Sequence, residues 1–361
     1  MPHPLDRADL RTRVQTRLDT ELDRWESELA AIGPDVVDLV EPVRSLLQGG
    51  KRLRAGFAYW GWRAAGREDH EGAISLATSM EFFQAAALIH DDVMDDSETR
   101  RGKPAMHRAL SRTHDGRGWH GDPDRFGMAG AILAGNLCLG WCDDLFSDSG
   151  LPVESLTSAR PAFERMRGQL MAGQFLDIVT SMRPWDRLAD AERIERSRHV
   201  IRYKSAKYSI EHPLLIGATA GGASAEDLDA LSRYGLALGE AFQLRDDVLG
   251  VFGDPQVTGK PAGDDLREGK RTVLIARALA GADDVMRTQV DQWLGASDLG
   301  PDEVRDFQQL LVDTGALDGV EADIEHGATA AKSALAEATG VDDPARSVLA
   351  ELIDATTART T

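Results

Sequence analysis

Apolar residues recur at helical spacing along almost the whole chain. Leu18, Leu22, Trp25, Leu29 and Ile32, for example, follow the i, i+4, i+7, i+11 spacing of an amphipathic helix. Alternating runs of β-branched residues, the usual sign of a half-buried strand, do not stand out. The pattern therefore predicts an all-α protein.

Short stretches rich in glycine, proline and aspartate separate the predicted helices. They lie at residues 49–50, 102–104, 111–125, 183–186, 221–222 and 253–265. Residues 126–141, between two of these breaks, are apolar nearly all round. A helix of that kind has to be covered on every side, either in the core or in a subunit interface, and the sequence favours neither.

Composition narrows the class of protein. The chain has 361 residues, of which 42% are hydrophobic, enough for one large core or two ordinary domains. Its formal charge of −19 argues against nucleic acid as a partner. The first residues lack the apolar stretch of a secretory signal, and no apolar segment spans a bilayer comfortably, so we expect a cytoplasmic protein without a membrane span. Cys138 and Cys142 have no second Cys or His pair nearby in sequence and are interpreted as core residues.

The strongest local signal is the acidic sequence LIHDDVMDDSETRRGKP at residues 88–104. If the preceding helix continues, Asp91 and Asp95 share one face, and Asp92 and Asp96 share the adjacent one. Such a cluster is tolerable as a solvated helix end or where cations neutralise it. Mg²⁺ is typically held by a few carboxylates together with phosphate oxygens of a substrate. Because the aspartates directly follow an apolar run, we favour a metal site.

Basic residues accompany the aspartates. Arg100 and Arg101 follow them directly, and arginine is the bidentate partner of phosphate. Two further basic segments are GGKRLRAG at 49–56 and YKSAKYSIEHP at 203–213. Lysine is rare in this chain, yet six of its seven lysines lie in or beside the motifs: Lys51, Lys103, Lys204, Lys207, Lys260 and Lys270. Together these features predict a metal–diphosphate site.

A second acidic cluster occupies residues 242–272, FQLRDDVLGVFGDPQVTGKPAGDDLREGKRT. Gln243 and Asp247 are four residues apart, as are Phe242 and Asp246, so each pair shares a helix face. A pair of aspartates in a helix is usually structural. As the second cluster of carboxylates and lysines in one helical protein, however, it suggests the opposing wall of the same cavity.

Five motifs in this order make the chain resemble the trans-isoprenyl diphosphate synthases, or polyprenyl synthetase family, and in detail bacterial geranylgeranyl diphosphate synthases. The motifs are GGKRLR, LIHDDVMDDSETRRGKP, KSAKYS, FQLRDDVLG and GKPAGDDLREGK, and the resemblance covers about residues 15–335. It implies one all-helical domain over residues 1–361, with about ten or more helices around a deep apolar cavity. It also implies a homodimer, three Mg²⁺ ions with substrate bound, and condensation of isopentenyl diphosphate with an allylic diphosphate.

The resemblance implies roles for individual residues. Those that match the catalytic positions are Asp91, Asp92, Asp95, Arg100, Lys204 and Asp246. Those that match the magnesium ligands are Asp91, Asp92, Asp95, Asp246 and Asp247. Those that match the isopentenyl diphosphate site are Lys51, Arg54, Gln84 and Arg101. Those that match the allylic diphosphate site are Arg100, Lys204, Ser205, Gln243, Lys260 and Lys270.

The chain departs from the family pattern at two of these motifs. Gly250 stands where the second motif usually has its last aspartate, and either Asp254 or a water could fill that gap. Ser205 replaces the more usual threonine but keeps the hydroxyl. Two other functions stay open: a terpene cyclase, which would not need Lys51, Arg54 and Arg101, and a non-catalytic subunit that regulates a synthase.

Product length is predicted from the residues before Asp91. Short-chain members of the family have an aromatic floor four or five residues earlier, where this chain has Ala87 and Ala86. The next residue on that face is Phe83, about one helical turn or 5.4 Å deeper, close to one isoprene unit. If Phe83 is the floor, the product is geranylgeranyl diphosphate. The alternatives are that Phe83 turns aside and longer chains form, or that it is only a core residue.

Overall fold

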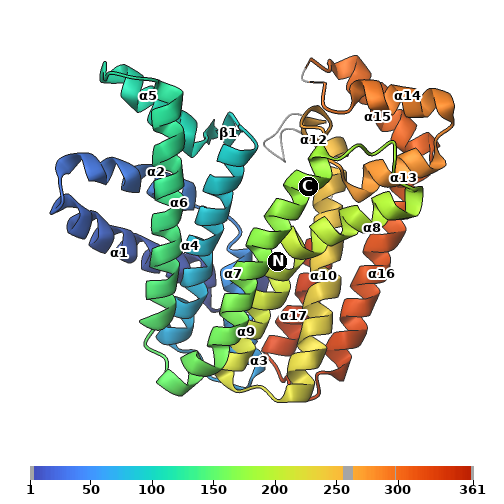
Figure 1. Ribbon diagram of the computed structural model, residues 1–361. Coiled ribbons are helices and arrows are strands. Elements are labelled where there is room, and N and C mark those ends of the chain that lie inside the picture. Colours follow the sequence, from blue (N-terminus) through green and yellow to red (C-terminus); the bar gives the residue numbers. More distant parts are fainter. Residues whose placement is uncertain (1–3, 255–262, 297, 359–361) are drawn as a thin grey trace. The chain divides into compact units, whose positions relative to one another are not determined.

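The computed structural model describes residues 4–254, 263–296 and 298–358. These residues are helical almost throughout, which confirms the all-α prediction (Figure 1). The strands among them are β1 (Thr99–Arg100) and β2 (Lys103–Pro104), which form one antiparallel hairpin. The described residues divide into two compact units, residues 1–160 with 216–223 and residues 161–215 with 224–361. A single domain over 1–361 with a deep apolar cavity stays a prediction.

Unit 1 is built around two long helices. Its elements are η1 (Pro4–Asp9), α1 (Leu10–Ala30), η2 (Pro34–Leu39), α2 (Val40–Leu47), α3 (Leu53–Ala64), α4 (Glu71–Met94), α5 (Met106–Gly116) and α6 (Pro123–Ser147). Helix α4 packs against both α3 and α6. Glycine at 135 permits this approach, because a Cβ there would lie 2.2 Å from Nε2 of His90. Of the described helices, only α4 has the length and hydropathy of a possible membrane span, and 83% of that window is buried in the protein.

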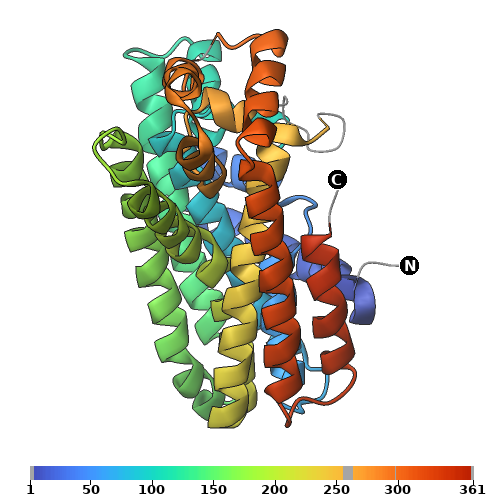
Figure 2. The ribbon, with the colours of Figure 1, turned by 90° about the vertical axis from the view of Figure 1, so that its right-hand side faces the viewer.

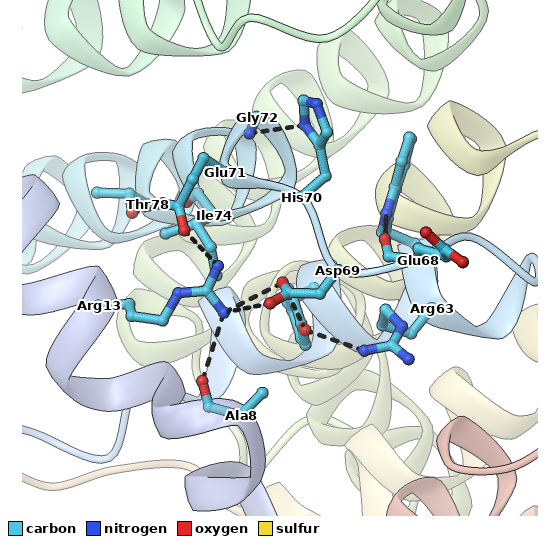
Figure 3. Close-up of polar contacts among 12 residues, drawn as sticks. Ala8, Arg13, Arg63, Glu68, Asp69, His70, Glu71, Gly72, Ile74 and Thr78 are labelled. Atoms are coloured by element: carbon cyan, nitrogen blue, oxygen red, sulfur yellow. Dashed lines mark hydrogen bonds and ion pairs between the residues drawn. The ribbon is translucent and has the colours of Figure 1, made fainter.

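The first residues of α4 are tied to the N-terminal helix by a polar cluster (Figure 3). Arg13 of α1 pairs with Asp69 at 2.9 Å and with Glu71 at 2.6 Å. The hydroxyl of Tyr59 donates to Asp69 at 2.9 Å. His70 caps α4 by accepting a hydrogen bond from the amide of Gly72, which satisfies one of the free donors at the helix start. These contacts fix where α4 begins, and therefore where its far end presents the first aspartates.

Unit 2 contains α8 (Asp190–Val200), η3 (Ile201–Glu211, a π-helix), α10 (Ala225–Phe252), α12 (Asp264–Arg267), α13 (Val273–Gly281), α14 (Asp284–Trp293), α15 (Pro301–Asp313), α16 (Ala316–Glu337) and α17 (Ala345–Thr357). Two further helices, α7 (Val153–Met182) and α9 (His212–Gly221), contribute residues to both units. Helix α10 packs along α16 and against η3 (Figure 2). The core here is mainly aliphatic, with Leu244, Val248 and Leu274 among its buried residues.

Most predicted breaks coincide with ends of helices, but two local predictions are wrong. Of the predicted break at 253–265, residues 255–262 lie outside the described residues. In the predicted loop at 111–125, residues 111–116 belong to α5, where Leu110 and His114 are buried, and residues 123–125 belong to α6. Ile32 lies beyond the end of α1 and is 74% exposed, so it does not belong to the apolar face. Cys138 and Cys142 are fully buried, as expected for core residues.

The apolar helix α6 is not covered on every side by the described chain. Met128, Ile132 and Leu133 are 47%, 42% and 56% exposed, although the neighbouring Ala131 and Ala134 are buried. The prediction that this helix is covered on every side by the core is therefore wrong for this face. An interface with another chain stays a prediction.

Candidate active site

The first acidic motif lies at the C-terminal end of α4, as the spacing predicted. Asp91 and Asp95 are one helical turn apart, and the amide of Asp95 donates to the carbonyl of Asp91 at 2.8 Å. The Asp91 side chain is 20% exposed, and Asp95 is exposed at the cap of the helix. Both carboxylates are therefore accessible from solvent on one face, the arrangement that a hydrated Mg²⁺ requires.

The other two aspartates of the motif are held by arginines. Asp92 is 2% exposed and accepts hydrogen bonds from the guanidinium of Arg100, with a donor–acceptor distance of 2.9 Å from Nε. Burial raises the pKa of Asp92, and the bond to Arg100 opposes this effect. Asp96 has a φ of 53° and pairs with Arg108 at 3.0 Å. Asp91 also lies 3.7 Å from Nη2 of Arg100, so the same guanidinium faces both Asp91 and Asp92.

The glycine-rich basic segment and Arg101 come together, as a diphosphate site at these residues would require. Gly50 has a φ of 91°, and a Cβ there would lie 3.3 Å from Nη1 of Arg101. Arg101 also donates to the carbonyl of Leu46 at 3.0 Å. Burial lowers the pKa of Arg101. The positive charges of Arg52 and Arg54 lower this pKa further, whereas the negative charge of Glu81 raises it. Guanidinium groups gathered in this way favour an anion between them.

A buried ion pair holds that segment in place. Arg52 and Glu81 are 4% and 5% exposed and pair at 3.0 Å. Arg52 is in the left-handed region, with a φ of 52°, and also donates to Leu47 and Gln15. Glu81 accepts a second bond, from the amide of Ala55 at 3.2 Å, at the start of α3. We did not foresee Glu81, because it lies 29 residues from its partner in a buried apolar helix.

The KSAKYS segment forms part of η3, a π-helix of 11 residues. Departures of this kind from α-helical geometry frequently occur at functional sites. Gly173 of α7 makes room for it, because a Cβ there would lie 2.5 Å from the carbonyl carbon of Tyr203. One turn later, Asp177 pairs with Nζ of Lys204 at 2.6 Å. Asp177 was missed in the sequence, although its spacing from Gly173 on one helix face offered a signal.

The second acidic motif lies at the end of α10. Gln243 donates to the carboxylate of Asp247 at 2.8 Å, so the predicted shared face is confirmed. Burial raises the pKa of Asp247 to about 8, the bond to Gln243 lowers it, and the charges of Asp265 and Asp246 add to the increase. Burial therefore disfavours the charged form of Asp247.

The space beside Gly250 in this motif is occupied by a side chain from outside the helix. A Cβ at 250 would lie 1.9 Å from Oδ2 of Asp265, so this carboxylate, and not that of Asp254, is the group packed closest against Gly250. Lys270 pairs with the same carboxylate at 2.7 Å. Lys260 lies outside the described residues. The described residues do not bring three or more metal-ligating side chains into one ready-made cluster.

Comparison with known proteins agrees with the motifs. The family model described as polyprenyl synthetase matches residues 37–311. A geranylgeranyl pyrophosphate synthase structure from Corynebacterium glutamicum, complexed with isoprenyl diphosphate and magnesium, is similar with 41% identity and a TM-score of 0.88, covering 96% of this chain and 98% of that one. A geranylfarnesyl diphosphate synthase from Aeropyrum pernix is 32% identical, covering 92% of this chain and 97% of the relative. A geranylgeranyl diphosphate synthase from Sulfolobus acidocaldarius is 32% identical over 69% of each chain. The chain belongs to the polyprenyl synthetase family of prenyltransferases.

Proposed function

We propose that this prenyltransferase adds isopentenyl diphosphate to an allylic diphosphate and releases the twenty-carbon geranylgeranyl diphosphate. The observation that supports it most is the pair of accessible carboxylates, Asp91 and Asp95, in the same unit as Arg54 and Arg101, whose positive charges act on each other. One group suits magnesium and the other suits a diphosphate.

The carboxylates present suit a divalent cation that would bind together with the diphosphate of the substrate. Asp91 and Asp95 would hold cations at the first motif, with Asp92 behind them. Asp246 would hold a cation at the second motif, with Asp247. Three ions with substrate bound is the number that we propose. When bound, Mg²⁺ would neutralise the negative charge that develops on the departing diphosphate. The magnesium in the similar Corynebacterium structure supports this assignment.

The chain's own groups would bind and orient the allylic diphosphate. We assign this role to Arg100 and Lys204, with Ser205, Gln243, Lys260 and Lys270. Arg100, which donates to Asp92, could exchange this carboxylate for a phosphate, because a guanidinium group binds either anion with two hydrogen bonds. Lys204 is oriented by Asp177. Departure of the diphosphate would leave an allylic cation, and apolar surroundings would keep away the water that could trap it.

Isopentenyl diphosphate would bind at the first unit's basic cluster. We assign Lys51, Arg54, Gln84 and Arg101 to its diphosphate. Its double bond would attack the allylic cation, and a proton would then leave to the released diphosphate. Because a terpene cyclase needs no such second diphosphate site, the close approach of Arg101 to Gly50 supports the synthase. The retained aspartates and arginines likewise argue against a non-catalytic regulatory subunit.

Product length is proposed from α4. Phe83 is 1% exposed and Ala86 is fully buried, and the small side chain of Ala87 would leave room in the turn above Phe83. Phe83 would form the floor that stops growth at twenty carbons. The similar geranylfarnesyl diphosphate synthase makes a longer product the main alternative.

A homodimer and a cytoplasmic location complete the proposal. The exposed apolar face of α6, with Met128, Ile132 and Leu133, supports the dimer, because large apolar patches commonly mark protein interfaces. The burial of α4 inside its unit supports a location away from the bilayer.

Metal-site variants test the proposal. Asp91→Ala or Asp95→Ala should each lower turnover by several orders of magnitude with the fold intact, because the charge on the leaving diphosphate is no longer neutralised. Asp96→Ala is the matched control, since Asp96 pairs with Arg108 instead, and should retain most of the activity. Near wild-type turnover in the Asp91 and Asp95 variants would refute the proposed site.

A further inference from the structure

Arg271, the residue directly after Lys270, is held at both its main chain and its side chain. Its carbonyl accepts a hydrogen bond from the hydroxyl of Ser197 at 2.7 Å, and its guanidinium carbon lies 5.0 Å from the centre of the Trp185 ring. Ser197 and Trp185 are 1% and 3% exposed. Ser197 belongs to α8 and Trp185 to the segment before it, and α8 packs against α13, which begins two residues after Arg271 (Figure 1). The main chain after Lys270 is therefore fixed from the side of α8.

The same face of α8 also holds Trp185. Arg193 is 6% exposed, and its Nε donates to the carbonyl of Trp185 at 2.9 Å. Nη1 of Arg193 pairs in turn with Asp190, which orients the guanidinium. Arg193 and Ser197 are four residues apart and so lie on one face of the helix. This face thus contacts both partners of the stack between Trp185 and Arg271.

The stack joins a planar cation to an aromatic face. Nε of Arg271 and Nε1 of Trp185 are both buried, and neither has a hydrogen-bond partner among the described residues. Burial lowers the pKa of Arg271, the negative charge of Asp291 opposes this effect, and the positive charge of Arg193 adds to it. The attraction between the guanidinium and the ring therefore holds this side chain in place.

Lys270 depends on this main chain for the position of its ammonium group. The side chain is 41% exposed and has a flexible four-carbon stem, so its reach is set by where its backbone lies. The amide of Lys270 donates to the carbonyl of Asp265 at 3.0 Å, which fixes the backbone on the side of α12. The contacts to Arg271 fix it on the side of α8.

We propose that Ser197, Arg193 and Trp185 position Lys270 for the allylic diphosphate through their hold on Arg271. The inference rests on the proposed function, which assigns Lys270 to that diphosphate. These side chains act on the main chain and on the Arg271 side chain, so they are positioning residues and not catalytic ones. Their loss should weaken use of the allylic primer and leave the use of isopentenyl diphosphate, which is assigned to residues of the first unit, unchanged.

Steady-state kinetics with each substrate varied in turn test this. Ser197→Ala and Trp185→Ala should each raise the KM for the allylic primer about 3- to 10-fold, as expected for the loss of one such contact, with the KM for isopentenyl diphosphate unchanged. Trp185→Phe keeps an aromatic face and should restore the wild-type KM. Thr314→Val is the matched control, because it removes another hydroxyl of the second unit that donates to a carbonyl, that of Leu310 at 2.9 Å, and it should change neither KM.

A second set of variants shows whether the effect passes through Lys270. Lys270→Ala should itself raise the KM for the allylic primer. Ser197→Ala added to Lys270→Ala should raise it no further, because residues that act through one group have non-additive effects. Melting temperatures show which variants are folded. Ser197→Ala removes a single hydroxyl, so the test does not depend on the folding of Trp185→Ala.

Three results would overturn the inference. The first is a folded Ser197→Ala variant whose two KM values are unchanged or rise equally, which would leave the proposed function intact. The second is a rise in the Lys270→Ala background as large as in the wild type, which would mean that Ser197 does not act through Lys270. The third is an unchanged KM for the allylic primer in Lys270→Ala, which would also refute the proposed assignment of Lys270.

Discussion

The buried pair between Arg52 and Glu81 gives the sharpest test of how the isopentenyl diphosphate site is held. Glu81→Gln keeps the size of the side chain and leaves an amide oxygen for the amide of Ala55. It removes the charge that faces Arg52 at 3.0 Å, where both side chains are less than a tenth exposed. Breaking a buried pair in this way typically costs about 3–5 kcal/mol, because one charge stays buried and unpaired.

The expected loss is large enough to measure by thermal unfolding. For a unit of 150–250 residues, 1 kcal/mol lowers the melting temperature by about 2–4 °C, so the Glu81→Gln variant should melt roughly 6–20 °C lower. Glu28→Gln is the matched control, since Glu28 pairs with Arg24 at 3.6 Å with both side chains about half exposed. Its effect should stay within about 1 kcal/mol.

The same variant has a functional readout below its melting temperature. The segment with Lys51 and Arg54 leads into α3. Arg52 is the N-cap residue of this helix, and Glu81 accepts a hydrogen bond from the amide of Ala55 in its first turn. The KM for isopentenyl diphosphate should therefore rise more than the KM for the allylic primer. If Glu81→Gln unfolds like Glu28→Gln and its KM values are unchanged, the pair does not hold this segment and the reasoning is refuted.

Three further predictions concern substrates, product and pH. Lys51→Ala should mainly raise the KM for isopentenyl diphosphate and Lys204→Ala that for the allylic primer; equal effects on both substrates would show that the two sites are misassigned. Ala87→Phe should shorten the product to fifteen carbons and Phe83→Ala should lengthen it, as chromatography of the products would reveal; an unchanged product in both would exclude this helix face as the determinant of length. Burial lowers the pKa of His212 to about 4. Below pH 6.5 the unfolded chain protonates this histidine while the folded protein keeps it neutral. The free energy of unfolding therefore falls by up to ~3 kcal/mol as the pH drops from 6.5 toward 4. The unfolding free energy of His212→Gln should fall less over that range, and an identical fall would contradict this account.

The helices, and the residues that share one helix face, could be predicted because local sequence patterns determine them. Helical periodicity and glycine pairs located most helices, and the four-residue spacing placed Asp91 and Asp95 on one face of α4. The predicted loop at 111–125 was wrong in its first half because polar composition concealed the buried His114. Periodicity alone could not show that this histidine faces inward.

Contacts between distant parts of the sequence could not be predicted in this way. The pairing of Asp177 with Lys204 depends on the close approach that Gly173 allows. The packing of Asp265 against Gly250 depends on where the chain returns after α10. In both cases the signal was a glycine on a helix face, whose meaning appears only when the neighbouring backbone or side chain is known.

The central claim is tested most directly by the product of one reaction. Purified protein is incubated with Mg²⁺, labelled isopentenyl diphosphate and farnesyl diphosphate, and the products are sized by chromatography with and without a chelator. The account predicts a labelled twenty-carbon diphosphate that disappears when the metal is removed and returns when Mg²⁺ is restored. Label that stays in isopentenyl diphosphate, or a product that forms equally well in the chelator, would contradict it.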